Sequence, residues 1–258
     1  RSHTGALAGE DAAVSAFFRD CGMVRVDMLE TLFEIAPLLA GRKPPELSRA
    51  PRVAVMTTTG GGAASVVDRM GTQGLEAIAP DAALRERLAS LGVSDLDSPI
   101  VDLTMAATGR QYAAVLDALL ESPACDAVVA VVGSSAQFHP QLAVEPILQS
   151  KRSAKPLAAF FTPHAERSLA LLAERGIAAF RTPESCVDAL RTYFSWRVPR
   201  ERQAGVSLAR PAGGGPSRGP PEGPGPAVFS PPVRAPGAAA HSPAPPDRHP
   251  PRPPGRGP

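Results

Sequence analysis

The chain has 258 residues, of which 43% are hydrophobic, and its formal net charge at pH 7 is +2. This small positive excess lies largely in the C-terminal part and argues against nucleic-acid binding, while no apolar run approaches the roughly 20 residues that span a bilayer. The 3 cysteines show no CxxC or Cys/His spacing, which argues against a disulfide framework or a structural zinc site and favours a reducing, cytoplasmic setting.

The first 43 residues predict an incomplete α/β unit. Helical periodicity covers residues 10–19 and 28–40, a short apolar segment lies between them, and Asp27 is expected to cap the second helix. A segment of about forty residues rarely buries enough surface to fold alone. We therefore expect residues 1–43 to be the C-terminal remnant of a larger domain, joined by a proline-containing linker at 44–51 to the segment that follows.

From residue 52 onward, short β-branched or apolar runs alternate with longer helical segments, as in βαβ units that build a parallel sheet. Strands are expected at residues 52–58, 75–79, 100–104, 126–133, 156–162 and 178–181. Helices are expected at residues 61–73, 81–91, 111–121, 141–149, 165–175 and 184–194. Asp81 is placed to cap the second of these helices, and Pro146 should interrupt the fourth. The pattern predicts that residues 52–197 form a doubly wound, flavodoxin-like α/β domain.

The last part of the chain, residues 198–258, holds more than half of the 30 prolines together with many Gly, Ala, Ser and Arg residues. Such a composition leaves too little apolar burial to offset the entropy of ordering, so we expect a Pro/Gly-rich disordered tail. The tail is compatible with a natural linker and equally with translation in a shifted reading frame.

The segment S-H-T-G-A-L-A-G at residues 2–9 is the first candidate for chemistry. It places His3 in a loop of small residues just before a predicted helix. A neutral imidazole nitrogen in such a loop can attack a phosphoryl group, and the phosphohistidine is stabilised where backbone N–H groups and helix N-termini converge. The spacing alone also fits a flexible chain end without a catalytic role.

A second candidate is T-T-T-G-G-G-A-A at residues 57–64, at the junction of the first strand and helix of the complete domain. Gly60, Gly61 and Gly62 let the backbone approach a bound group closely, and free N–H groups at the helix start favour an anion. The run lacks the GK[ST] ending of a P-loop and the GxGxxG of a dinucleotide fold, which argues against ATP and NAD. A ligand-free turn is the alternative.

Three further polar residues, Asp102, Ser134 and Ser135, follow predicted strands that end at the same edge of the sheet. They could line a crevice there, although Asp and Ser are also common turn and cap residues at such positions. His139 and His164 stand beside prolines at helix starts, where caps or surface residues are expected. Because no Ser-His-Asp arrangement and no GxSxG elbow can be assigned, hydrolase chemistry has no specific support.

Taken in order, S-H-T-G-A-L-A-G, R-V-D-M-L-E-T-L-F, R-V-A-V-M-T-T-T-G-G-G-A-A-S-V-V-D and P-I-V-D-L resemble the NDP-forming acyl-CoA synthetases, relatives of succinyl-CoA synthetase. The resemblance covers residues 2–196. It implies that residues 1–43 end a phosphohistidine-bearing CoA-ligase domain and that His3 relays a phosphoryl group between acyl phosphate and nucleotide. By position, Thr59, Gly60, Gly61 and Gly62 would present a helix N-terminus to the phosphohistidine.

The resemblance also implies partners and cofactors. CoA-binding and ATP-grasp domains or subunits would complete the enzyme, with CoA, ATP/ADP and Mg as its cofactors and acyl phosphate or acyl-CoA as its reactants. We expect none of these cofactors to be held by this chain alone. The triple Thr and triple Gly depart from the family's T-N-S-G-G-P-G form, which leaves the acyl substrate open. Two alternatives remain, a non-catalytic interaction module that uses the Pro-rich tail and a frame-shifted, inactive gene product.

Overall fold

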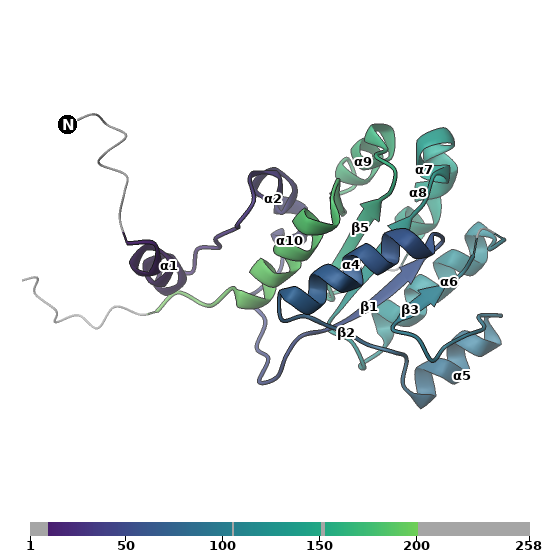
Figure 1. The fold of residues 1–258 in the computed structure, drawn as a ribbon, viewed down its shortest axis with the longest axis horizontal. Coiled ribbons are helices and arrows are strands. Elements are labelled where there is room, and N and C mark those ends of the chain that lie inside the picture. Colours follow the sequence, from purple (N-terminus) through teal and green to yellow (C-terminus); the bar gives the residue numbers. More distant parts are fainter. Residues whose placement is uncertain (1–9, 105, 151–152, 201–258) are drawn as a thin grey trace, which may run out of the picture. The chain divides into compact units, whose positions relative to one another are not determined.

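The computed structural model describes residues 10–104, 106–150 and 153–200 (Figure 1). The chain divides into two compact units, Arg1–Ala204 and Gly205–Pro258. His3 and its loop lie outside the described residues, and so does nearly all of the predicted tail.

The described chain forms a six-stranded parallel sheet that confirms the predicted doubly wound α/β fold (Figure 1). Its strands are β1 (Arg52–Thr57), β2 (Glu76–Ala77), β3 (Ile100–Asp102), β4 (Ala127–Val132), β5 (Leu157–Phe161) and β6 (Ala178–Phe180). The order is β2-β1-β4-β5-β6, with β3 also paired to β1. Because β2 pairs with the start of β1 and β3 with its end, these two short strands together flank the same side of β1.

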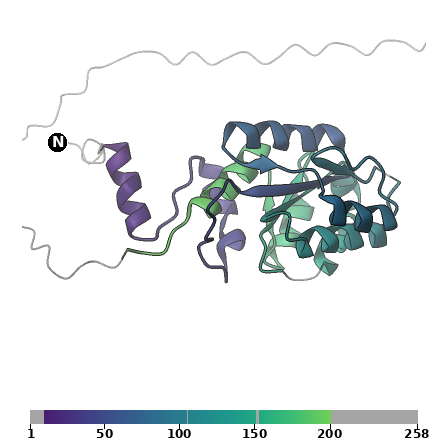
Figure 2. The same ribbon diagram turned by 90° about the horizontal axis from the view of Figure 1, so that it is seen from below.

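Helices cover both faces of the sheet (Figure 2). The helices of the complete domain are α4 (Gly60–Thr72), α5 (Ala82–Ser90), α6 (Gly109–Glu121), α7 (Ser135–Phe138), α8 (Pro140–Gln149), α9 (Glu166–Ala173) and α10 (Pro183–Ser195). Buried side chains of α4 and α10 pack on one face, and those of α5, α6, α8 and α9 pack on the other. In Figure 2 the blue helix α4 lies on one side of the strand layer and teal helices lie on the opposite side.

Strand β4 shows why the apolar run of this region is continuous. Val129 and Val131 belong to the core under α4 and α10, whereas Val128, Ala130 and Val132 belong to the core under α6, α8 and α9. All six residues of the strand are buried, and the strand pairs with β1 on one side and β5 on the other. A central strand covered on both faces has no polar alternation, as was predicted.

Two predicted helix features are wrong in detail. α8 continues through Pro146 instead of stopping there, because Pro146 and Ile147 are buried and the packing of the helix outweighs the lost N–H. Asp27 does not cap α2, whose N-cap residue is Met28 and has no side-chain cap bond. The predicted capping by Asp81 is confirmed, since its side chain accepts the N–H of Leu84 at 2.9 Å.

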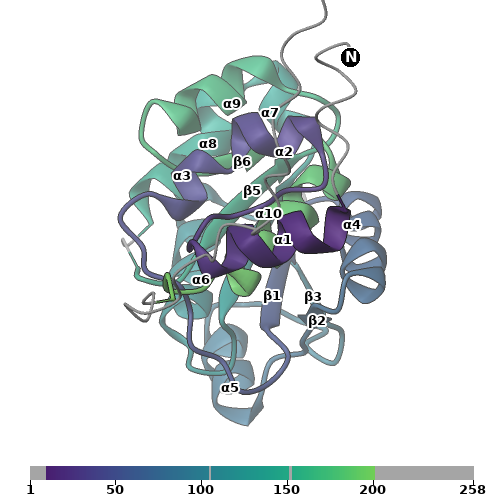
Figure 3. The same cartoon turned by 90° about the vertical axis from the view of Figure 1, so that its left-hand side faces the viewer.

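The N-terminal segment contains α1 (Asp11–Asp20), α2 (Leu29–Glu34) and α3 (Ala36–Leu39) (Figure 3). α2 and α3 pack on α10, whereas α1 has no buried residue. The buried carboxylate of Asp188 in α10 accepts the backbone N–H groups of Asp27 at 3.0 Å and Met28 at 3.2 Å. The indole N–H of Trp196 donates to the carbonyl of Gly22 at 2.9 Å. These contacts fix residues 22–28 to the last helix of the domain.

Candidate functional site

The carboxyl edge of the sheet has a topological switch point between β1 and β4. After β1 the chain leaves through α4 toward β2, and after β4 it leaves through α7 and α8 toward β5 on the other side. Because the two connections diverge onto opposite faces, a crevice opens outside the ends of these strands. The segments that follow β1 and β4 therefore form the candidate site.

The amino terminus of α4 reaches this crevice without a side-chain cap. Thr59 is its N-cap residue, and no side chain accepts from the first turn. The hydroxyl of Thr57 instead accepts the N–H of Thr59 at 2.8 Å and donates to its carbonyl at 2.9 Å. The N–H groups of Gly60, Gly61 and Gly62 precede the first intrahelical bond, so they and the positive end of the helix dipole are available to an anion.

The three glycines have different surroundings. A Cβ on Gly62 would lie 2.3 Å from Cγ2 of Thr162 and 3.1 Å from Cγ1 of Val131, so close packing of α4 on the sheet requires glycine there. A Cβ on Gly61 would meet nothing within 4 Å, and both Gly60 and Gly61 are exposed. One glycine therefore serves packing, and two leave the backbone open to a bound group.

Asp102 ends β3 beside this helix terminus. One carboxylate oxygen accepts the N–H of Thr104 at 2.8 Å, and the other would lie 3.6 Å from a Cβ on Gly60. Asp102 therefore acts as a turn residue, which was the interpretation that the sequence favoured. Its negative charge also lies close to the amino end of α4, where it complements the helix dipole.

A cavity of about 290 Å³ occupies the crevice beside Thr59. Its polar lining comes from the segments after three strands and from the start of α6, and consists of Thr58, Thr59, Thr104, Thr108, Ser134, Ser135, His139 and Tyr112. Apolar side chains of α8, including Leu142 and Pro146, complete the wall. Ser134 and Ser135 thus line a crevice as the sequence suggested, and Thr59 lines it with them, while Asp102 does not line the cavity.

Tyr112 is the least expected member of this lining. It is buried, and its hydroxyl has no hydrogen-bond partner among the described residues. Burial raises the pKa of Tyr112 above its ordinary value, so the hydroxyl stays protonated and can donate. An unpaired buried hydroxyl costs stability, and residues at functional sites commonly carry such a cost. The amphipathic pattern of α6 predicted a buried face here but gave no sign that this face reaches a crevice.

A charged network ties the N-terminal segment to the same edge of the sheet. Arg181, directly after β6, donates to the carboxylate of Glu34 at 2.7 Å and also pairs with Glu166. His164, predicted as a surface residue, contacts the same Glu166 carboxylate at 2.9 Å and is exposed. Hydrogen bonds that Arg181 donates to Glu34 and Glu166 raise the pKa of Arg181, while Arg181 and His164 lower the pKa of Glu166. This network anchors the end of α2 at the carboxyl edge.

The N-terminal segment also presents apolar side chains to solvent. Leu29, Leu32 and Phe33 of α2 are 66%, 58% and 75% exposed.

Within the residues that the structure describes, no group of three or more His, Cys, Asp or Glu side chains could hold a metal ion. The helices in that same part of the chain are too short or too polar to cross a membrane.

Comparison with known proteins identifies relatives of the chain. A family model described as the succinyl-CoA ligase like flavodoxin domain matches residues 1–39. The alpha subunit of ADP-forming acetate–CoA ligase I of Pyrococcus furiosus is 26% identical over 207 residues, which cover 76% of this chain and 43% of that protein. The alpha subunit of ligase II of the same organism is 27% identical over 197 residues, covering 73% and 42%. The chain thus spans less than half the length of the curated relatives that it matches.

Solved structures share the fold. Dinucleotide-forming acetyl-coenzyme A synthetase 1 of Ca. Korarchaeum cryptofilum, in complex with phosphate and ADP, superimposes with a TM-score of 0.60 at 24% identity. The match covers 75% of this chain and 42% of that one. A Pyrococcus horikoshii crystal structure gives a TM-score of 0.58 at 20% identity, covering 73% and 44%. At these identities the structural matches bear on the fold, which they confirm.

Proposed function

We propose, from the premise that the chain belongs to the NDP-forming acyl-CoA synthetases, that it is a fragment or subunit of such a ligase and relays a phosphoryl group through His3. The observation that carries the proposal is the uncapped amino terminus of α4 at the switch point of the sheet. The two curated relatives are themselves alpha subunits of ADP-forming acetate–CoA ligases, which fits a chain that works with other parts.

The relay consists of two phosphoryl transfers. A nitrogen of His3 attacks the phosphorus of an acyl phosphate, the P–O bond to the acyl group breaks, and a carboxylate leaves. In the second step the N–P bond breaks while an oxygen of a nucleoside diphosphate bonds to phosphorus. Reversal of both steps, followed by attack of CoA on the acyl phosphate with release of phosphate, makes acyl-CoA. Histidine suits this role because its neutral ring is nucleophilic near neutral pH.

The amino terminus of α4 fits a phosphate group at the centre of this relay. Its end carries about half a positive charge, and the N–H groups of Gly60, Gly61 and Gly62 can donate to a phosphate dianion. Exposed Gly60 and Gly61 allow that group to approach the backbone. The neighbouring cavity, with Thr59 in its wall, offers hydroxyl donors to the acyl phosphate on the same edge. We assign the loop that begins at Thr59 as the phosphate cradle.

The N-terminal segment fits the end of the histidine-bearing domain. The family match to residues 1–39 supports a separate unit at the start of the chain. We assign residues 1–43 to the histidine-bearing domain, 44–51 to a linker and 52–197 to a complete flavodoxin-like domain. The exposed apolar side chains of α2 would be covered by the remainder of the first domain. Because Glu34 is paired with Arg181, the end of α2 lies at the same edge of the sheet as the cradle.

Nucleotide, Mg and CoA are assigned to partner domains. The glycine loop lacks the lysine of a P-loop, so a nucleotide would be held by an ATP-grasp domain and CoA by a separate CoA-binding domain. The complete enzyme would thus divide the work, with this chain supplying the nucleophile and the phosphate cradle and with the partners supplying the reactants.

Phosphorylation of His3 is the direct test. The purified full chain is mixed with CoA-binding and ATP-grasp partners of a related synthetase and with γ-labelled ATP, and acid-labile, base-stable label on this chain is measured. We expect label on the native chain and none on a His3→Ala variant. Folded, associated partners that give no label would refute the relay.

Two variants of α4 test the cradle separately. Gly61→Glu places a negative charge in the first turn, and Gly71→Glu places the same charge in the last turn of the same helix. Both glycines are exposed, and neither would have a neighbour within 4 Å of an added Cβ, so both variants should fold. We expect Gly61→Glu to lower phosphohistidine at least tenfold and Gly71→Glu to leave it unchanged. Equal labelling of the two variants would refute the cradle while leaving His3 as the relay residue.

A further inference from the structure

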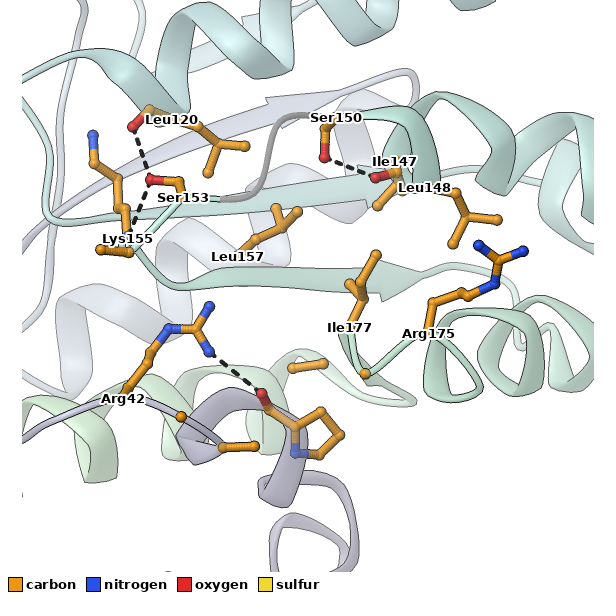
Figure 4. A pocket seen from close by; sticks show the side chains of 16 residues that line it. Arg42, Leu120, Ile147, Leu148, Ser150, Ser153, Lys155, Leu157, Arg175 and Ile177 are labelled. Carbon is orange, nitrogen blue, oxygen red and sulfur yellow. Dashed lines mark hydrogen bonds between the residues drawn. The ribbon is translucent and has the colours of Figure 1, made fainter.

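A second cavity lies at the amino edge of the sheet, opposite to the edge where α4 begins (Figure 4). Its volume is about 310 Å³, and its wall includes residues at the starts of β5 and β6 and at the ends of α6 and α8. It shares no lining residue with the cavity at the carboxyl edge. A ligand bound there would therefore be separate from the proposed phosphoryl relay.

Two arginines contribute charge to this cavity. Arg42 follows α3, and Arg175 lies in the turn between α9 and β6. Figure 4 shows them on opposite sides of the view, with Leu157 and Ile177 between them. Arg42 uses one guanidinium nitrogen for the carbonyls of Pro37 and Leu38, at 3.4 Å and 2.9 Å, while its buried Nε has no hydrogen-bond partner among the described residues.

The charge of these arginines is not balanced within the wall. The described residues that line the cavity include no Asp or Glu, and the structure shows no ion pair for Arg42 or Arg175 in the described part of the chain. Burial lowers the pKa of Arg42, as expected for a cation without a carboxylate beside it. A guanidinium group keeps its charge in such a place and binds carboxylate and phosphate oxygens strongly.

Lys155 also lines the cavity but has a different role. Its ammonium donates to the carbonyls of Leu119 and Ser122 at the end of α6 and contacts the sulfur of Cys125 at 3.4 Å. All three donors of the ammonium are therefore used in satisfying the end of a helix. The binding capacity that remains belongs to the two arginines.

The rest of the wall is largely apolar. Leu120, Ile147, Leu148, Leu157 and Ile177 supply aliphatic surface, and the cavity has the size of a small-molecule site. If the cavity held only water, its aliphatic surface would stay hydrated and the arginines would lack a negatively charged partner. We propose that the cavity binds a small amphipathic anion, with its carboxylate or phosphate head at the guanidinium of Arg42 and its aliphatic body extending across Leu157 and Ile177 toward Arg175.

Binding of octanoate to the full chain, measured by calorimetry at low salt, tests this proposal. We expect saturable binding with one site, similar binding of octyl phosphate, and at least tenfold weaker binding of octanol, which has the same body without the charge. Arg42→Gln should weaken octanoate about tenfold, which is the loss expected for one hydrogen bond to a charged group. Arg175→Gln, on the opposite side of the cavity, should weaken it by less than about threefold. Because Arg42 also donates to two carbonyls of α3, a variant that fills the cavity and leaves those bonds in place provides a second test.

Two controls separate the cavity from other surfaces. Arg167→Gln removes an exposed arginine of α9 that does not line the cavity and should leave octanoate binding unchanged. Ala154→Phe fills space at the wall and should weaken octanoate and octyl phosphate together. The proposal is overturned by binding that is indifferent to Arg42→Gln or to Ala154→Phe, by a larger loss in Arg175→Gln than in Arg42→Gln, by octanol that binds as tightly as octanoate, or by an absence of saturable binding. Octanoate that adheres to the exposed apolar side chains of α2 instead would bind both the Arg42→Gln and the Ala154→Phe variant unchanged, and octanol would bind as tightly.

Discussion

Adding one methyl group to Gly62 should destabilise the protein, whereas the same change at Gly61 should stabilise it. Both residues are in the first turn of α4, where replacing Gly by Ala gains about 1 kcal/mol of helix propensity. At Gly61 the new Cβ meets nothing within 4 Å, so the full gain remains. At Gly62 it would lie 2.3 Å from Cγ2 of Thr162, more than about 1 Å inside the ordinary carbon–carbon contact distance of about 3.5–4.0 Å.

Relief of that clash requires Thr162 or the start of α4 to move, and overpacking of this kind costs about 1–3 kcal/mol. Gly62→Ala should thus have a free energy of unfolding about 0–2 kcal/mol below the native chain and about 1–3 kcal/mol below Gly61→Ala. Urea denaturation followed by the fluorescence of Trp196, the single tryptophan, measures the difference. Equal midpoints and equal slopes for the two variants would refute the argument that α4 packs closely against β4 and Thr162.

Three further variants test other parts of the structure. Asp188→Asn removes the carboxylate that accepts two N–H groups of the N-terminal segment, and should lower the free energy of unfolding by about 2 kcal/mol and speed proteolysis between α1 and α2. Tyr112→Phe removes an unpartnered buried hydroxyl and should raise the free energy of unfolding by about 1 kcal/mol in urea denaturation, so a large loss would reveal an overlooked partner. Burial raises the pKa of Asp126, but hydrogen bonds from Arg49 and from the N–H of Arg52 outweigh it and lower that pKa below its ordinary value. The stabilisation is therefore present above the unfolded-state pKa of about 3.9 and is lost as pH falls through the lower folded-state value, so the difference between native chain and Asp126→Asn should close below about pH 4.

The order of strands and helices could be predicted because each depends on a local pattern. The buried run of β4, the cap at Asp81 and the junction that begins at Thr59 are all readable from a few neighbouring residues. The failure at Asp27 has a long-range cause, since its backbone N–H is bound by Asp188, 161 residues away in the chain. No local cap propensity anticipates a carboxylate that arrives from the last helix.

Some residues of the candidate site could also be predicted from local sequence, whereas others depend on the tertiary fold. Gly60, Gly61 and Gly62 follow a strand, so a helix terminus at the carboxyl edge could be predicted from their position. Tyr112 and Thr104 enter the crevice through the tertiary arrangement of α6 and β3, and their types alone fit a buried face and a turn equally well. Arg42 and Arg175 are likewise 133 positions apart in the chain, and only the fold brings them to the wall of one cavity.

The attachment of the N-terminal segment to α10 has a consequence for synthesis on the ribosome. The hydrogen bonds from the N–H groups of Asp27 and Met28 cannot form until Asp188 has been synthesised, 161 and 160 residues later. At about 5–20 residues per second this interval lasts about 8–30 s. Throughout it, Ile35 and Leu38, which are buried in the core shared with α10 in the folded chain, emerge without that helix. The nascent chain therefore offers a hydrophobic target to chaperones until α10 has left the exit tunnel.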